Sequence, residues 1–211
     1  MIINKNQIQR LYDQSYFSYT ATYFGAVMAF WLFKGITPDT VLNTWFIIFT
    51  IFTSARFFVT WKFNNSDHEK NIDVWMMVFL ITSAISGTMW GLTGFIFIPE
   101  GALPLLENIL HHGILLLFIA TLIAGSIITY SASKTVYLSF SVPAIIPQCL
   151  MLVAQGDKYH SFLGGIVLIY AFIMFVISVY INRVFSECDE VYVRNKFLKS
   201  IIEKHGIKIE E

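Results

Sequence analysis

Apolar residues fall along the chain in six long runs that are separated by short polar connections. A membrane-crossing helix needs about twenty mostly apolar residues, and each run meets or nearly meets that length. The six expected spans are 15–33, 41–61, 74–98, 105–130, 135–154 and 162–181. Because the connections are short, sequential helices should run antiparallel. The pattern predicts an all-α fold, an integral membrane six-helix bundle with a helical extension at its C-terminal end.

The sixth apolar run passes into a charged segment, residues 182–204, with no Pro or Gly between the two. One helical rod that leaves the bilayer and continues into water is the simplest interpretation. Its apolar residues repeat with the a and d spacing of a coiled coil, in which an Asn at an a position favours a parallel pair. The expected pairing residues are Val191, Asn195, Leu198 and Ile202. A solvated amphipathic tail is the alternative, because the pattern lasts only about three heptads.

Composition places the chain in a membrane. Of its 211 residues 56% are hydrophobic and 13% charged, which leaves too little polar surface to cover a soluble globule. The lipid bilayer is therefore an expected partner, and no basic patch suggests nucleic acid. We expect a cytoplasmic N-terminal segment (1–14), a six-helix domain (15–183) and a cytoplasmic helical tail (184–211). The first run lacks a following small-residue cleavage site, so we expect it to be a retained span.

Charge placement predicts the orientation. If the N-terminus is cytoplasmic, all of the 14 Lys and Arg residues except Lys34 and Lys158 fall on the inner side. By the positive-inside rule, both termini of this multi-pass chain should be cytoplasmic. Arg56, near the inner end of the second run, should extend its long side chain to the interface. Trp45 and Tyr130 are among the aromatic residues expected to anchor span ends at the headgroup level.

Two runs carry residues that affect helix packing. Gly87, Gly91 and Gly94 recur at intervals of three and four in the third run, and such small residues let helices approach closely in lipid. We expect a helix–helix contact on that face. Pro143 and Pro147 each remove a backbone hydrogen bond from the fifth run, which should bend or break there. The pair is a candidate hinge, and a static kink is the alternative.

Ionisable residues are scarce in the apolar runs, and the fourth run begins with a group of them. Glu107 and His111 are four residues apart, so on a helix they share a face and are able to pair, with His112 about 100° away. This group is our candidate site for sensing a ligand or a proton. The alternative is a purely interfacial position at the outer boundary, because residues 113–130 alone nearly span a bilayer.

The sequence carries no motif of a membrane enzyme. Ser126 has no clear partner histidine at membrane depth, and His111-His112-Gly113 does not supply the His-Glu-x-x-His of a zinc protease. We therefore expect no catalysis, no cofactor and no metal. A small transporter or channel remains an alternative function, favoured by the paired prolines and the Glu/His group. The absence of a convincing internal repeat and of an acidic residue at mid-span argues against it.

Several short motifs resemble a known class of membrane region. They are Trp90-Gly91-Leu92-Thr93-Gly94 with Pro99, Ser131-Ala132-Ser133-Lys134, Val142-Pro143-Ala144-Ile145-Ile146-Pro147, Gly156-Asp157, and Arg194-Asn195-Lys196-Phe197-Leu198. Together they make the chain similar to the N-terminal membrane-associated sensor region of bacterial hybrid histidine kinases and diguanylate cyclases. The resemblance implies a sensory input module of the kind found in two-component and cyclic di-GMP signalling, with the last helix as its output.

The chain departs from that class in one respect. It contains no kinase histidine box, no Gly-Gly-Asp/Glu-Glu-Phe cyclase signature and no receiver domain. We therefore expect either an isolated input region or a separate output partner, a cytoplasmic kinase or cyclase. We expect the module to form a homodimer through its last helix and tail, with the signal passing along that helix to the cytoplasm.

Overall fold

The computed structural model describes residues 5–66, 71–97, 104–130 and 132–204 and is all-α over these ranges. It contains six long helices and one additional turn of helix. They are α1 (Lys5–Phe33), α2 (Asp39–Asn64), α3 (Ile72–Gly91), the single turn α4 (Thr93–Ile96), α5 (Leu105–Tyr130), α6 (Lys134–Ala154) and α7 (Lys158–Lys204). The helices therefore match the predicted order of apolar runs, with the third run divided at Leu92.

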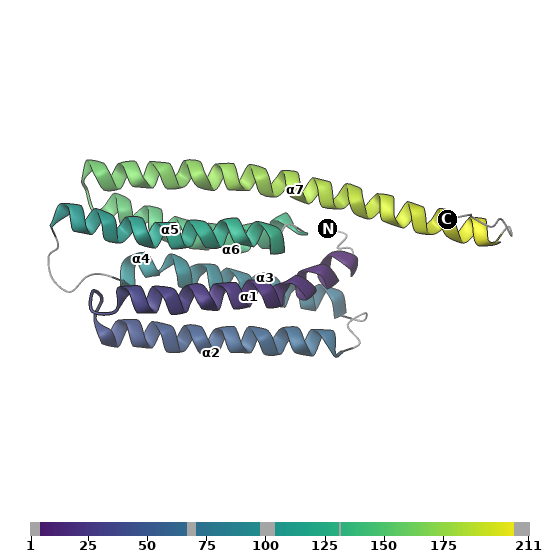
Figure 1. Cartoon of the computed structure of the whole chain (residues 1–211), viewed down its shortest axis with the longest axis horizontal. Helices are drawn as coiled ribbons and strands as arrows, with labels where there is room; N and C mark the ends of the chain where they lie inside the picture. The colour runs from purple at the N-terminus through teal and green to yellow at the C-terminus, as the bar shows by residue number, and fades with distance from the viewer. Residues whose placement is uncertain (1–4, 67–70, 98–103, 131, 205–211) are drawn as a thin grey trace.

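Successive long helices run antiparallel, and the helices that pack most extensively side by side are α3 with α6, α6 with α7, and α1 with α2 (Figure 1). The α1–α2 hairpin forms one side of the molecule, α7 forms the opposite side, and α3, α5 and α6 lie between them. The first residues of α1 and the last residues of α7 lie toward the same end of the long axis. α7 is much the longest helix and extends beyond the others at that end, without interruption between its apolar and charged halves. The predicted continuity of this rod is confirmed.

Five helices in the described part of the chain are long and apolar enough to cross a membrane, which indicates a multi-pass membrane protein. They are α2, α3 together with α4, α5, α6, and α7 from Lys158 to Cys188. The helix that contains the first predicted span, α1, is not among these five. It begins ten residues before the predicted span and includes charged and polar residues: Lys5, Arg10, Asp13, Ser15, Ser18, Thr20 and Thr22.

Aromatic side chains fill much of the core. Trp90 is fully buried and meets Trp45 and Phe49 edge to face, with ring centroids 5.5 and 5.6 Å apart. Such edge contacts add to the free energy gained by burying the rings. The expectation that Trp45 and Tyr130 anchor at the headgroup level is wrong, because both are buried against other helices. Hydropathy located the helix ends but not the direction in which each ring points.

α3 packs more extensively against α6 than any other pair of helices does; Gly87 and Gly91 lie in this contact, and Gly94, in α4, also faces α6. A Cβ atom added at Gly87 would overlap the carbonyl oxygen of Phe140, and one at Gly91 would overlap that of Pro143. One added at Gly94 would meet the Gln148 side chain. α6 is therefore the partner of the glycine face, and the two backbones touch there directly.

α6 continues as a helix through both prolines. The alternative of a break at Pro143 and Pro147 is therefore wrong. Pro147 has no N–H to donate to the carbonyl of Pro143, so this oxygen lacks its usual partner within the helix. Gly91 of α3 lies against that same oxygen, which allows a Cα–H···O contact. A neighbouring backbone thus covers the carbonyl that the second proline leaves free.

We expect Gly87→Ala to destabilise the protein by about 1–3 kcal/mol, because the new methyl group meets backbone atoms that no rotamer change can move away. Gly165→Ala is the matched control, since a Cβ there has nothing within 4 Å. The control should be neutral or slightly stabilising. Unfolding of both variants in detergent, followed by circular dichroism, measures the difference. Equal stabilities would show that α3 and α6 do not require contact between their backbones.

Candidate functional site

A chain of polar side chains lies where α7 begins. Gly156, with φ +74°, makes the turn after α6, and Asp157 then caps the next helix. Its Oδ1 accepts the backbone N–H groups of Tyr159 at 2.9 Å and His160 at 3.0 Å. These are the second and third residues of α7, whose N–H groups have no partner within the helix. The cap therefore fixes where α7 starts.

The Asp157 carboxylate also orients His160. Its Oδ2 bonds Nδ1 of the imidazole, which therefore carries the proton. The other nitrogen of His160, Nε2, is left to accept, and it lies 3.0 Å from Nδ1 of His112 on α5. The His160 side chain is fully buried, and His112 is 3% exposed. This Asp157–His160–His112 chain joins the first turn of α7 to α5.

His111 belongs to the same buried group but has other partners. Its Nε2 lies 2.6 Å from the carbonyl oxygen of Phe97, just beyond α4. Its ring lies edge to face with Phe33 at the end of α1, with centroids 4.9 Å apart, and with His112 at 5.5 Å. His111 thus connects α5 to the ends of α1 and α4, whereas His112 connects it to α7.

Glu107 takes no part in this cluster. It is exposed on the first turn of α5, and the structure gives it no hydrogen bond to His111. The sequence predicted that Glu107 and His111 share one face of the helix. In the structure, however, Glu107 is exposed and His111, one turn later, is buried. The carbonyl of Phe97 occupies the place beside His111 that Glu107 was expected to take. The predicted Glu107–His111 pair is therefore not formed, and both histidines are buried among helices.

The structure places the other predicted residues away from this site. Gly87, Gly91, Pro143 and Pro147 lie along the α3–α6 contact, and Gly94 lies where α4 meets α6. Val191 is 60% exposed on the extension of α7. The side chains of Asn195, Leu198 and Ile202 lie outside the described residues, although the α7 backbone is helical at all three positions.

Sequence analysis missed Asp157 and His160 as members of the site. The signal present in the chain is Asp-x-x-His directly after a glycine, at the start of the sixth apolar run. Such spacing predicts a capped first turn with the histidine close to the cap. It does not predict His112 as the partner, because the two histidines are 48 residues apart in the sequence.

Burial and hydrogen bonding restrict the chemistry that this chain can do. Donated N–H groups, above all that of His160, hold the pKa of Asp157 below its ordinary value. With the carboxylate charged, one proton between His112 and His160 completes the chain. If both imidazoles are protonated, both facing nitrogens are donors, so their hydrogen bond is lost and two positive charges lie side by side. Within the described residues no group of three or more His, Cys, Asp or Glu is placed to hold a metal ion.

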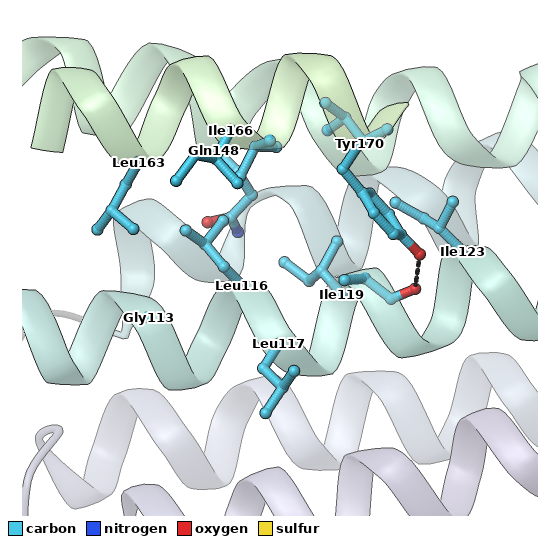
Figure 2. Close-up of a pocket in the computed structure, with 12 residues that line it drawn as sticks. Gly113, Leu116, Leu117, Ile119, Ile123, Gln148, Leu163, Ile166 and Tyr170 are labelled. Carbon is cyan, nitrogen blue, oxygen red and sulfur yellow. Dashed lines mark hydrogen bonds between the residues drawn. The ribbon is translucent and has the colours of Figure 1, made fainter. Parts of the chain in front are cut away.

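An apolar cavity of about 210 Å³ lies beside this chain, between α5, α6 and α7 (Figure 2). Gly113, the residue after His112, lines it near one end, and Tyr170 donates to the carbonyl of Ala120 at 2.6 Å near the other. Gln148 contributes to its wall while its amide donates to the carbonyl of Gly91 at 2.9 Å. Two polar contacts therefore tie α7 to α5, on either side of a space without packing atoms. The helix gains less dispersion energy there than in a filled interface.

Comparison of the chain with protein-family models, with curated proteins and with solved structures found no match. Function is therefore inferred from the chain's own residues and their arrangement.

We expect stability at pH 7 to fall in the order wild type, Asp157→Asn, Asp157→Ala. Asn keeps an oxygen for the backbone N–H groups but loses the charge beside His160, and Ala loses both. Because the folded-state pKa of Asp157 is lowered, its stabilisation is present above the ordinary carboxyl pKa and is lost as pH falls through the lower folded value. Melting temperatures between pH 7 and pH 2 should show the wild type and Asp157→Asn converging. A constant difference would contradict the assignment.

Proposed function

We propose that this chain is a sensory input module of the bacterial inner membrane, which passes a signal through α7 to a cytoplasmic output partner. One observation carries the proposal. α7 is a single helix that begins at the Asp157–His160–His112 chain and ends at Lys204, beyond the other helices (Figure 1). A stimulus that changes the start of this helix is transmitted to its far end, because an uninterrupted helix moves as a unit.

The proposed topology has six crossings with both termini in the cytoplasm. α1 is the first crossing, although it is the most polar of the six, because it packs alongside α2 and α5 over much of its length. The charge distribution supports this orientation, since Lys34 and Lys158 are the only Lys or Arg residues of the chain that it places outside. It puts the polar start of α7 at the outer face and the charged extension in the cytoplasm.

Protonation of the facing histidines is the proposed stimulus. The titratable groups at this point are His111 and His112 from α5, and Asp157 and His160 from the start of α7. Lys158 and Glu107 lie nearby but are exposed. Doubly protonated His112 and His160 repel each other, so acidification favours an arrangement in which the start of α7 is displaced from α5. Protons therefore bind the docked and the displaced arrangements of α7 with different free energies. Such a difference is required of any effector.

The output is proposed to be a change in pairing between two copies of α7. The side chains of Val184, Cys188 and Val191 are exposed on the extension and occupy a or d positions. Pairing would bury them, and Asn195 would favour a parallel, in-register dimer. A cytoplasmic kinase or cyclase that binds the paired extension would then respond to its register, with no catalysis by this chain itself.

Pairing is tested by disulfide crosslinking at Cys188 in a Cys149→Ala background. Leu198→Gly and Ile202→Gly should each reduce the crosslinked dimer severalfold, because each removes an apolar a or d side chain and weakens the helix. Ser200→Gly is the matched control, since it carries the same helix penalty at an outward f position. Dimer yields that fall equally in all three variants, or in none, would exclude the coiled coil.

The proposed stimulus is tested with spin labels at Cys188 in proteoliposomes whose internal pH is fixed. Lowering the pH on the side of His160 from 7.5 to 3.5 should change the distance between labels in the wild type, because both buried histidines must become charged. His112→Gln should abolish the change, because the Gln amide can donate a hydrogen bond to His160 but cannot become charged. Glu107→Gln should retain it, since that carboxylate lies outside the cluster. A response lost in Glu107→Gln and kept in His112→Gln would overturn the assignment.

Transport is the competing function, and the burial of His111 and His112 inside a helical protein is the observation that favours it. Proteoliposomes loaded with a pH dye distinguish the two functions. A steady proton flux that His111→Ala and His112→Gln abolish would replace the sensor proposal with a transporter. A pH-dependent change at Cys188 without flux supports the sensor.

A further inference from the structure

Arg56 is a buried cation for which the described residues provide no carboxylate. Its side chain is 3% exposed in the interior of the protein, between α2, α1 and α5, and does not extend to the interface as the sequence suggested. The guanidinium lies over the ring of Tyr19, 4.0 Å from the centroid, and donates to the hydroxyl of Tyr130 at 3.2 Å. Its Nε has no hydrogen-bond partner. Aromatic faces offset part of the cost of burying the charge, but an anion is the partner that would neutralise it.

The described side chains around Arg56 offer fewer hydrogen-bond acceptors than donors. The oxygen of Tyr130 accepts from Arg56 and also from the hydroxyl of Ser18, at 3.4 Å. The Tyr130 hydroxyl proton therefore still needs an acceptor. With the unpaired Nε of Arg56, this leaves two buried donors in one small cluster. A group that accepts several hydrogen bonds and carries negative charge, such as a carboxylate, would complete it.

Ser18 also lines an apolar groove between α1 and α5, two helices that lie side by side in Figure 1. The groove has a volume of about 600 Å³ and runs along α1 from Phe17 to Met28. At the helical rise this is a length of about 16 Å. One end, at Ser18 and Thr129, adjoins Tyr130 and Arg56, while the other end, at Met28 and Leu117, is wholly apolar. Its shape and polarity are those of a single-chain amphiphile.

We propose that this groove binds a fatty acid, with its chain between α1 and α5 and its carboxylate directed toward Ser18, Tyr130 and Arg56. A fatty acid fits better than a phospholipid because Arg56 lies eight residues before the end of α2, about 12 Å along the helix. A large headgroup would have to leave the interface to reach that depth, whereas a carboxylate is small enough to enter. This proposal is independent of the histidine cluster and of the sensory function.

Binding of radiolabelled laurate to the protein in nanodiscs tests the proposal, with empty nanodiscs subtracted. Laurate should bind saturably and should be displaced by unlabelled laurate at about tenfold or more lower concentration than by methyl laurate, since only the acid carries the charge. Gly125→Leu should abolish saturable binding, because residue 125 lines the groove and a Cβ there meets nothing within 4 Å. Gly165→Leu, an exposed change of the same type on α7, should bind like the wild type.

Arg56→Gln and Arg56→Lys test the charge. Arg56→Lys should retain a preference for laurate over its methyl ester, and Arg56→Gln should lose it, in samples whose circular dichroism and melting profile show a folded protein. If Arg56→Gln does not fold, Gly125→Leu and the ester still decide the question. Equal displacement by acid and ester in the wild type, or unchanged binding in Gly125→Leu, would overturn the proposal. Phospholipid that copurifies with the wild type but not with Gly125→Leu, without laurate binding, would replace the fatty acid as the occupant.

Discussion

The contact between the backbones of α3 and α6 is the constraint on which the rest of the structure depends. Gly87 and Gly91 bring the two helices close enough for backbone atoms to touch, and no larger residue fits there. In lipid, where apolar surfaces gain little by leaving the solvent, close packing of this kind is a main source of helix association. The same contact places Gln148 of α6 against the carbonyls of α3 and covers the Pro143 carbonyl that the second proline leaves free.

Against this tightly packed pair, α7 is held in a different way. Most of its apolar side chains are exposed, and a cavity separates part of it from α5. Its polar attachments are the cap at Asp157, the His112–His160 hydrogen bond and the Tyr170 hydroxyl, and one apolar face packs against α6 and α5. A helix with a narrow contact face and few polar ties moves more easily than one locked by backbone contact. The contact face of α7 is thus narrower than that of α6, and this difference is our reason for proposing that the signal passes through α7.

Buried polar groups make both proposed sites sensitive to a change in charge. At the histidine chain, every facing nitrogen has a partner in one protonation state and loses it in another. At Arg56 the deficit is permanent, because a positive charge and an unpaired donor are buried together. Burial makes both situations costly, since water cannot supply the missing hydrogen bond or screen the charge. One site therefore suits a proton and the other an anion.

The helical class, the positions of the apolar runs, the continuity of the last helix and the glycine face of α3 and α4 could all be predicted from the sequence alone. These properties depend on hydropathy, on helix breakers and on spacing along one helix, all of which are local. Only the tertiary structure shows that the glycines face α6. It also shows that Arg56 and Tyr130 point into the protein and that Glu107 lies outside the histidine cluster. It also joined His112 to His160. Those outcomes depend on how helices far apart in the sequence rotate against one another, and the pattern along a single helix does not record that rotation.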